Sequence, residues 1–173
     1  MFWFSIALLF VSLVVMMRED YLYRAISIKY IVVFILAALL LGSTENHLSD
    51  WIFNSAVNIG LLIFLLLCTQ VYYKLRFKQK GWFVDKVMGK GDLLFFMALG
   101  FVFSPLNFLM SLSFLSIISI VLALPIVLKN GVNQKLPLIS YMGLGLIIEF
   151  IIIYNYDIPV GNDSQLISVL LNG

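Results

Sequence analysis

Long apolar runs separated by short charged and polar clusters dominate this chain. A helix needs about 20 mostly apolar residues to cross a hydrocarbon core of about 30 Å, so we interpret these runs as membrane-spanning helices. The fourth and fifth runs join into one uncharged stretch, which we expect to break at Ser104-Pro105-Leu106-Asn107 because Pro and Asn interrupt helices. The six predicted spans are 2–17, 26–42, 51–73, 93–103, 106–128 and 136–156.

Composition supports the same class of protein. Of the 173 residues, 62% are hydrophobic and 12% are charged, whereas soluble domains average about 45–50% apolar and about 25% charged residues. A soluble domain and a disordered chain are therefore both excluded. We predict an all-α, polytopic membrane helix bundle that forms one domain over 1–173. The single cysteine, Cys68, excludes an intramolecular disulfide and any multi-cysteine zinc or redox site.

The basic residues predict the topology, because all 11 lie in or beside the odd-numbered connections between spans. They are Arg18, Arg24 and Lys29 in the first, Lys74, Arg76, Lys78, Lys80, Lys86 and Lys90 in the third, and Lys129 and Lys135 in the fifth. The positive-inside rule makes these connections cytoplasmic and places both termini outside. We expect an integral protein of the cell (inner) membrane.

The longest connection, 74–90, is basic and carries Trp82 and Phe83. Beside a membrane, such a segment typically lies on anionic lipid headgroups, so we expect contact with membrane lipids and none with nucleic acid. His47 has only Glu45 and Asp50 near it in sequence. We interpret it as a solvated loop residue and expect no metal site.

Acidic residues at membrane depth are costly and suggest function. Asp20 follows the first span and Asp92 opens the fourth, so both lie at cytoplasmic helix ends and can meet. Taken singly, Asp20 is explained by an i,i+4 pair with Arg24, and Asp92 by an N-cap. Taken together, two close carboxylates share a proton, so that one acts as general base on a water and the other as general acid. This chemistry needs no metal or cofactor.

Glu149 lies inside the last span, far from the cytoplasmic face. We expect it to be a buried, hydrogen-bonded carboxyl with a polar partner in the third span, such as Asn54, Asn58 or Gln70.

Two motifs resemble the type IV prepilin peptidases, which are membrane aspartic proteases of the GxGD class. Met88-Gly89-Lys90-Gly91-Asp92 is similar to the family's second motif, and the segment 20–27, Asp-Tyr-Leu-Tyr-Arg-Ala-Ile-Ser, to its first. A third likeness is Leu136-Pro137-Leu138-Ile139 at the start of the last span. Together with the number of spans, the resemblance covers nearly the whole chain.

The resemblance implies an endopeptidase that cleaves the basic leader of prepilin-like or pseudopilin-like precursors at the cytoplasmic face. Asp20 and Asp92 would be its catalytic pair, and Gly89 and Gly91 would shape the loop that brings Asp92 to its partner. Because the leader is basic, we further predict that acidic groups such as Glu19 and Asp85 bind it.

The resemblance also concerns a second activity, since some members carry a cytoplasmic four-cysteine domain and methylate the trimmed product. This chain has one cysteine and a first cytoplasmic loop of roughly ten residues. We expect a short form with peptidase activity alone.

Departures from the family pattern keep other functions open. Ile28, Leu94 and Ser140 stand where members often have Asn, a basic residue and a second Pro. A presenilin-like intramembrane protease also uses GxGD but places its first aspartate within a span. A noncatalytic membrane subunit or a small transporter would make Glu149 essential and Asp20 dispensable, whereas the peptidase requires the reverse.

Overall fold

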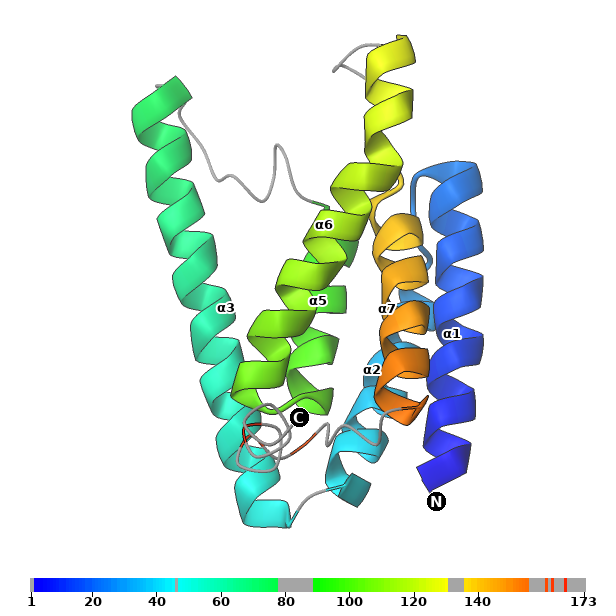
Figure 1. Ribbon diagram of the computed structural model, residues 1–173, viewed down its shortest axis with the longest axis vertical. Coiled ribbons are helices and arrows are strands. Elements are labelled where there is room, and N and C mark those ends of the chain that lie inside the picture. Colours follow the sequence, from blue (N-terminus) through cyan, green and yellow to red (C-terminus); the bar gives the residue numbers. More distant parts are fainter. Residues whose placement is uncertain are drawn as a thin grey trace.

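The structure is a computed structural model that describes residues 2–45, 47–77, 89–130 and 136–155, with 161, 163 and 167 further on. All elements that it describes in these ranges are helices, which confirms the predicted all-α class (Figure 1). They are α1 (Phe2–Tyr23), α2 (Ile28–Glu45), α3 (Leu48–Phe77), α5 (Lys90–Val102), α6 (Pro105–Asn130) and α7 (Leu138–Asn155).

Four of the described helices are long and apolar enough to cross a membrane, namely α1, α3, α6 and α7, and α2 is a shorter apolar helix. The protein is therefore an integral membrane protein with several spans. Each predicted span corresponds to one helix, and several helices extend beyond the apolar run. α1 continues past the predicted end at 17 as far as Tyr23, because charged residues can prolong a helix where it leaves the membrane. Asp20 thus lies within α1 and not after it.

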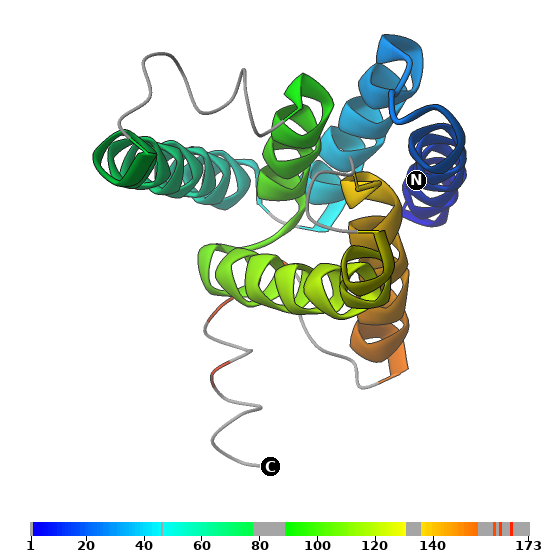
Figure 2. The same cartoon turned by 90° about the horizontal axis from the view of Figure 1, so that it is seen from above.

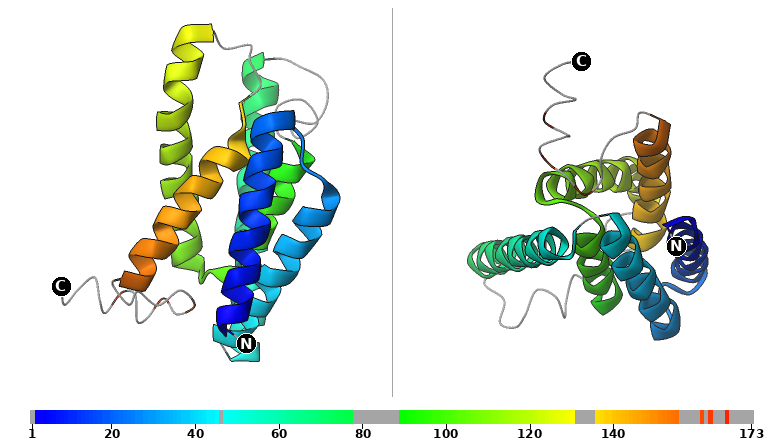
Figure 3. Two further views of the ribbon diagram at one scale, coloured as in Figure 1. Left: turned by 90° about the vertical axis from the view of Figure 1, so that its right-hand side faces the viewer. Right: turned by 90° about the horizontal axis from the view of Figure 1, so that it is seen from below.

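The helices form two groups when the bundle is viewed from above (Figure 2). One group is a row in which α3 packs on α5, α5 on α2, and α2 on α1. The other is α6 and α7, and α7 slants between α6 and α1, contacting both (Figure 3). The C-terminal end of α1 and the N-terminal ends of α5 and α7 point toward the same end of the bundle, at the top of Figure 1.

The core lies where α1, α2, α5 and α7 meet. Its largest fully buried side chains include Leu13, Phe34 and Phe95. The rings of Phe34 and Phe95 stack with centroids 5.4 Å apart and join α2 to α5. Apolar side chains also cover outward faces of the helices, such as Phe64 and Ile120. An apolar exterior of this kind suits a bundle that lies in lipid.

Helix α5 has 13 residues and is about 20 Å long. It ends where the sequence predicts the break, and side chains of α3 bind the carbonyls at this end. The amide of Asn58 donates to the carbonyl oxygens of Gly100 and Phe103, at 3.0 and 2.7 Å. Nε1 of Trp51 donates to the Phe101 carbonyl at 2.8 Å. These bonds satisfy carbonyls that a helix leaves free at its C-terminus, and α6 begins at Pro105.

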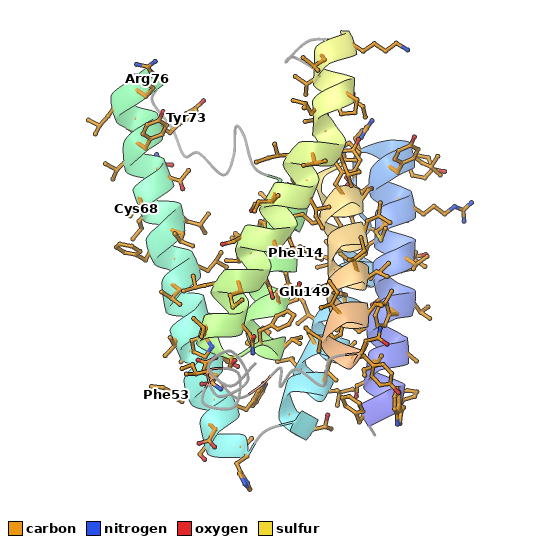
Figure 4. All side chains as sticks on the ribbon, viewed as in Figure 1. Phe53, Cys68, Tyr73, Arg76, Phe114 and Glu149 are labelled. Atoms are coloured by element: carbon orange, nitrogen blue, oxygen red, sulfur yellow. The ribbon has the colours of Figure 1, made fainter. Side chains whose placement is uncertain are left out.

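Glu149 has a different partner from the ones that the sequence suggests. Figure 4 shows it between α6 and α7, where the hydroxyl of Ser111 donates a hydrogen bond to Oε1. Asn58 is engaged with α5, and Asn54 donates to the Gly161 carbonyl at 3.3 Å. The expected partner on α3 was wrong because the helix that packs on α7 beside Glu149 is α6.

Candidate active site

Asp20 lies in the last turn of α1, and its side chain is 8% exposed. Helix α7 runs antiparallel to α1 and approaches it closely at Gly143, where an added Cβ would lie 2.6 Å from Cγ of Met17. One turn along each helix, this close approach sets Asp20 beside Ser140. The absence of a side chain at Gly143 therefore positions the first turn of α7 against the carboxylate.

Ser140 binds one oxygen of Asp20 with two groups. Its backbone N–H donates to Oδ2 at 2.9 Å, and its hydroxyl lies 3.2 Å from the same oxygen. The hydroxyl also lies 2.8 Å from the Met17 carbonyl, so its one proton serves either acceptor. The predicted alternative partner, Arg24, is placed elsewhere: its guanidinium lies 5.9 Å from the centroid of the Tyr21 ring. Asp20 is therefore held by α7.

Asp92 lies at the third position of α5, and the residue that caps the helix is Gly89. The expectation that Asp92 is the N-cap is corrected accordingly. The N–H of Gly89 donates to Oδ2 of Asp92 at 3.0 Å, and the N–H of Asp92 donates to the Gly89 carbonyl at 3.1 Å. The first of these bonds is one half of a capping box, in which the side chain of the third helical residue accepts a hydrogen bond from the N–H of the cap residue.

The two motif glycines differ in their surroundings. A Cβ at Gly89 would lie 3.1 Å from Oδ2 of Asp92, which is a tight contact. A Cβ at Gly91 would meet the Cδ1 atoms of Ile26, Ile31 and Ile139 at 3.6–3.9 Å, which are ordinary van der Waals contacts. Gly91 thus marks the point where the start of α5 packs against the start of α7, next to Ser140.

The carboxylates of Asp20 and Asp92 interact although they are 72 positions apart in the sequence. Asp92 precedes the apolar run of α5. Burial raises its pKa above the ordinary value for an aspartate, the hydrogen bond from Gly89 lowers it, and the negative charge of Asp20 raises it further. Repulsion between two nearby carboxylates favours a state in which they hold one proton between them.

The structure places the two residues predicted to bind a basic leader differently. Glu19 is half-buried at the end of α1, and both of its carboxylate oxygens face Ser27. The N–H of Ser27 donates to Oε2 at 2.7 Å, and the hydroxyl lies 3.2 Å from Oε1. Glu19 therefore joins α1 to the start of α2. Asp85 lies outside the described residues, as does most of the basic connection, 78–88.

Sequence reasoning missed Ser140 as a partner of Asp20. The available signal was a serine in the first turn of a helix, where backbone amides without helical partners form a ready anion site. The pattern does not say which anion lies there. Within the described residues, no three His, Cys, Asp or Glu side chains gather as a metal site would require.

Two acidic residues at one end of a membrane helix bundle are the arrangement that an aspartic hydrolase requires. The family model of type IV leader peptidases matches residues 7–128, which include both aspartates and all of α2, α3 and α5. The chain belongs to this family, which implies an aspartic-type prepilin peptidase. No curated protein and no solved structure matches the chain.

Proposed function

We propose that this protein is a membrane aspartic endopeptidase that removes the leader from prepilin-like precursors, with Asp20 and Asp92 as its catalytic pair. The observation that carries the proposal is that these two residues lie at the same end of the bundle, in the last turn of α1 and the first turn of α5 (Figure 1). Family membership supplies the reaction class. The two together account for residues that are otherwise costly in so apolar a chain.

The reaction needs only the two carboxyl groups and a water molecule. The carboxylate without a proton takes one from the water as the water oxygen attacks the scissile carbonyl carbon. The other carboxyl gives its proton to the carbonyl oxygen, so the intermediate carries two hydroxyl groups. When the C–N bond breaks, the first carboxyl returns its proton to the leaving nitrogen and the second regains one from a hydroxyl group. The pair is restored.

We place the site at the cytoplasmic face of the cell membrane. The described basic residues support this placement: Arg24 follows α1, and Lys74 and Arg76 lie in the last turn of α3, at the end of the bundle where α5 begins (Figure 4). Under the positive-inside rule this end faces the cytoplasm, where a basic leader ahead of an apolar helix is accessible. We further propose that this chain trims without methylating, since only residues 24–27 join α1 to α2.

The test is cleavage of leader-bearing prepilins by the membrane-embedded protein, followed by mass spectrometry. Asp20→Asn and Asp92→Asn should each lower the rate at least about 1000-fold, because neither carboxamide can accept or donate the proton. Asp50→Asn is the matched control, since Asp50 is an exposed aspartate in the first turn of α3, at the other end of the bundle.

Glu149→Gln separates the peptidase from a transporter or a noncatalytic subunit. Glu149 binds Ser111 inside the bundle, so the peptidase should retain its cleavage rate in this variant, whereas a function carried by Glu149 would be lost. Cleavage that survives in both Asp20→Asn and Asp92→Asn would overturn the assigned site. Transfer of a methyl group to the trimmed product would contradict the single activity.

A further inference from the structure

The two carboxylate oxygens of Asp20 differ in their hydrogen-bond partners. Oδ2 lies within hydrogen-bond distance of both donors of Ser140, at 2.9 and 3.2 Å. Among the described residues, Oδ1 has no hydrogen-bond partner. An aspartate side chain turns readily about its terminal torsion, so two donors on one oxygen fix which oxygen is left free.

The donor at 2.9 Å is a helix N-terminal amide. Ser140 is the third residue of α7, and amides in the first turn of a helix have no acceptor within the helix. The N-terminal end of a helix also carries a partial positive charge that favours an anion. Bonding to Asp20 therefore satisfies the amide and holds the carboxylate without breaking a bond inside α7.

The first turn of α7 also contacts α5, the helix that carries Asp92. Ile139 reaches Gly91, with its Cδ1 3.9 Å from the place of an added Cβ. Ser140 thus follows directly on a residue that packs on α5, next to Asp92. The first turn of α7 fixes Asp20 by hydrogen bonds and the start of α5 by apolar contact. It lies beyond residues 7–128, to which the family model extends.

We propose that Ser140 is a positioning residue of the peptidase: its amide and hydroxyl hold Oδ2 of Asp20 so that Oδ1 is the oxygen presented to the attacking water. This inference rests on the proposed function. Ser140 contacts no reacting atom and acts through Asp20. It therefore governs the turnover rate once substrate is bound and leaves substrate affinity unchanged.

Three variants separate the two donors. Ser140→Ala removes the hydroxyl and keeps the amide, so kcat should fall about three- to tenfold at unchanged KM. Ser140→Thr restores a hydroxyl and should recover most of the rate. Ser140→Pro also removes the amide, and kcat should fall about 100-fold, as expected when a reacting group is misplaced.

The matched control is Ser12→Ala. Ser12 is a buried serine of α1 whose hydroxyl donates to the Leu9 carbonyl at 2.9 Å, away from both aspartates. Like Ser140→Ala, this variant removes a hydrogen bond from a buried serine hydroxyl to a backbone carbonyl, which for Ser140 is the carbonyl of Met17. Ser12→Ala should leave kcat unchanged. Thermal unfolding in detergent reports whether each variant is folded.

The outcomes are distinct. A kcat loss in Ser140→Ala that Ser140→Thr reverses, with KM and the control unchanged, supports the proposal, even if Ser140→Pro does not fold. Ser140→Ala within twofold of the wild-type kcat overturns it, as does a loss that Ser12→Ala shares. In both of these cases wild type still cleaves and the proposed function stands. If wild type cleaves nothing while Asp20→Asn behaves identically, the proposed function fails and the role of Ser140 falls with it.

Discussion

The two ends of helix α5 are built in opposite ways. At the C-terminal end, Asn58 and Trp51 of α3 bind three carbonyl oxygens, and Gly42 of α2 lies so close that an added Cβ would overlap the Phe101 carbonyl. At the N-terminal end, Asp92 accepts one hydrogen bond within the described part of the chain, from Gly89, and the space beside Gly91 admits a methyl group.

The two ends of α5 therefore have different roles. The C-terminal end is closed by polar contacts from a neighbouring helix and sets the depth at which α5 ends. The N-terminal end carries Asp92, whose pKa is raised in part by the charge of Asp20. We therefore expect substitutions at the C-terminal end to lower the stability of the protein, and substitutions at the N-terminal end to lower its activity.

The largest expected effect on stability is that of Gly42→Ala. The added methyl group would overlap the Phe101 carbonyl and Nε1 of Trp51, so α2 must move away from α5, and we expect a loss of about 3 kcal/mol, as for overpacking. The control is Gly60→Ala, because nothing lies within 4 Å of a Cβ at Gly60. Equal unfolding midpoints for the two variants in detergent would refute the close approach.

The next effect in size is that of Asn58→Ala. Its side chain is fully buried and closes the end of α5 through two hydrogen bonds, so removing it leaves two carbonyls without their donor. We expect a loss of about 2 kcal/mol. Asn54→Ala on the same helix removes a single bond of 3.3 Å and should cost less than half as much. Chemical unfolding of both variants measures the ratio, and a larger cost for Asn54→Ala would contradict it.

At the N-terminal end, the two glycines of the motif should respond unequally. Gly89→Ala sets a methyl group against Oδ2 of Asp92, which must turn away from its position, and we expect about a tenfold lower kcat, equivalent to about 1.4 kcal/mol. Gly91→Ala meets only the ends of isoleucine side chains at ordinary distance and should change kcat less than threefold. Cleavage kinetics with one prepilin substrate measure both, and the reverse order would show that the packing beside Gly91 is the tighter one.

The sequence was sufficient for features that depend on a single stretch of chain. Apolar runs predicted the six helices of the described residues, and Pro105 predicted the break that ends α5, because lipid requires apolar side chains and proline interrupts a helix. The distribution of charges placed Asp20 and Asp92 at one end of the bundle, where the charge of Asp20 contributes to the raised pKa of Asp92. The catalytic role of these residues stays a prediction.

The hydrogen-bond partners of side chains across helices were beyond sequence reasoning. The partners of Glu149 and Asp20 turned out to be Ser111 and Ser140. Each pairing depends on how two helices are rotated about their axes and how near they lie, which for α7 is determined by the close approach at Gly143. A one-dimensional pattern contains neither quantity.

The smallest expected effect concerns pH and tests the interaction between the two aspartates without an activity assay. Burial and the charge of Asp20 raise the pKa of Asp92, against the bond from Gly89. A carboxyl whose pKa is raised by folding contributes stability that is fully present below its unfolded pKa and is lost as the pH rises through the folded value.

Wild type should therefore lose stability relative to Asp92→Asn as the pH rises from acid conditions. In Asp20→Asn the repelling charge is gone, so the corresponding loss should end at a lower pH and be smaller. Thermal midpoints of the three proteins over a pH series measure these differences, and parallel curves for wild type and Asp20→Asn would mean that the two carboxyls do not interact.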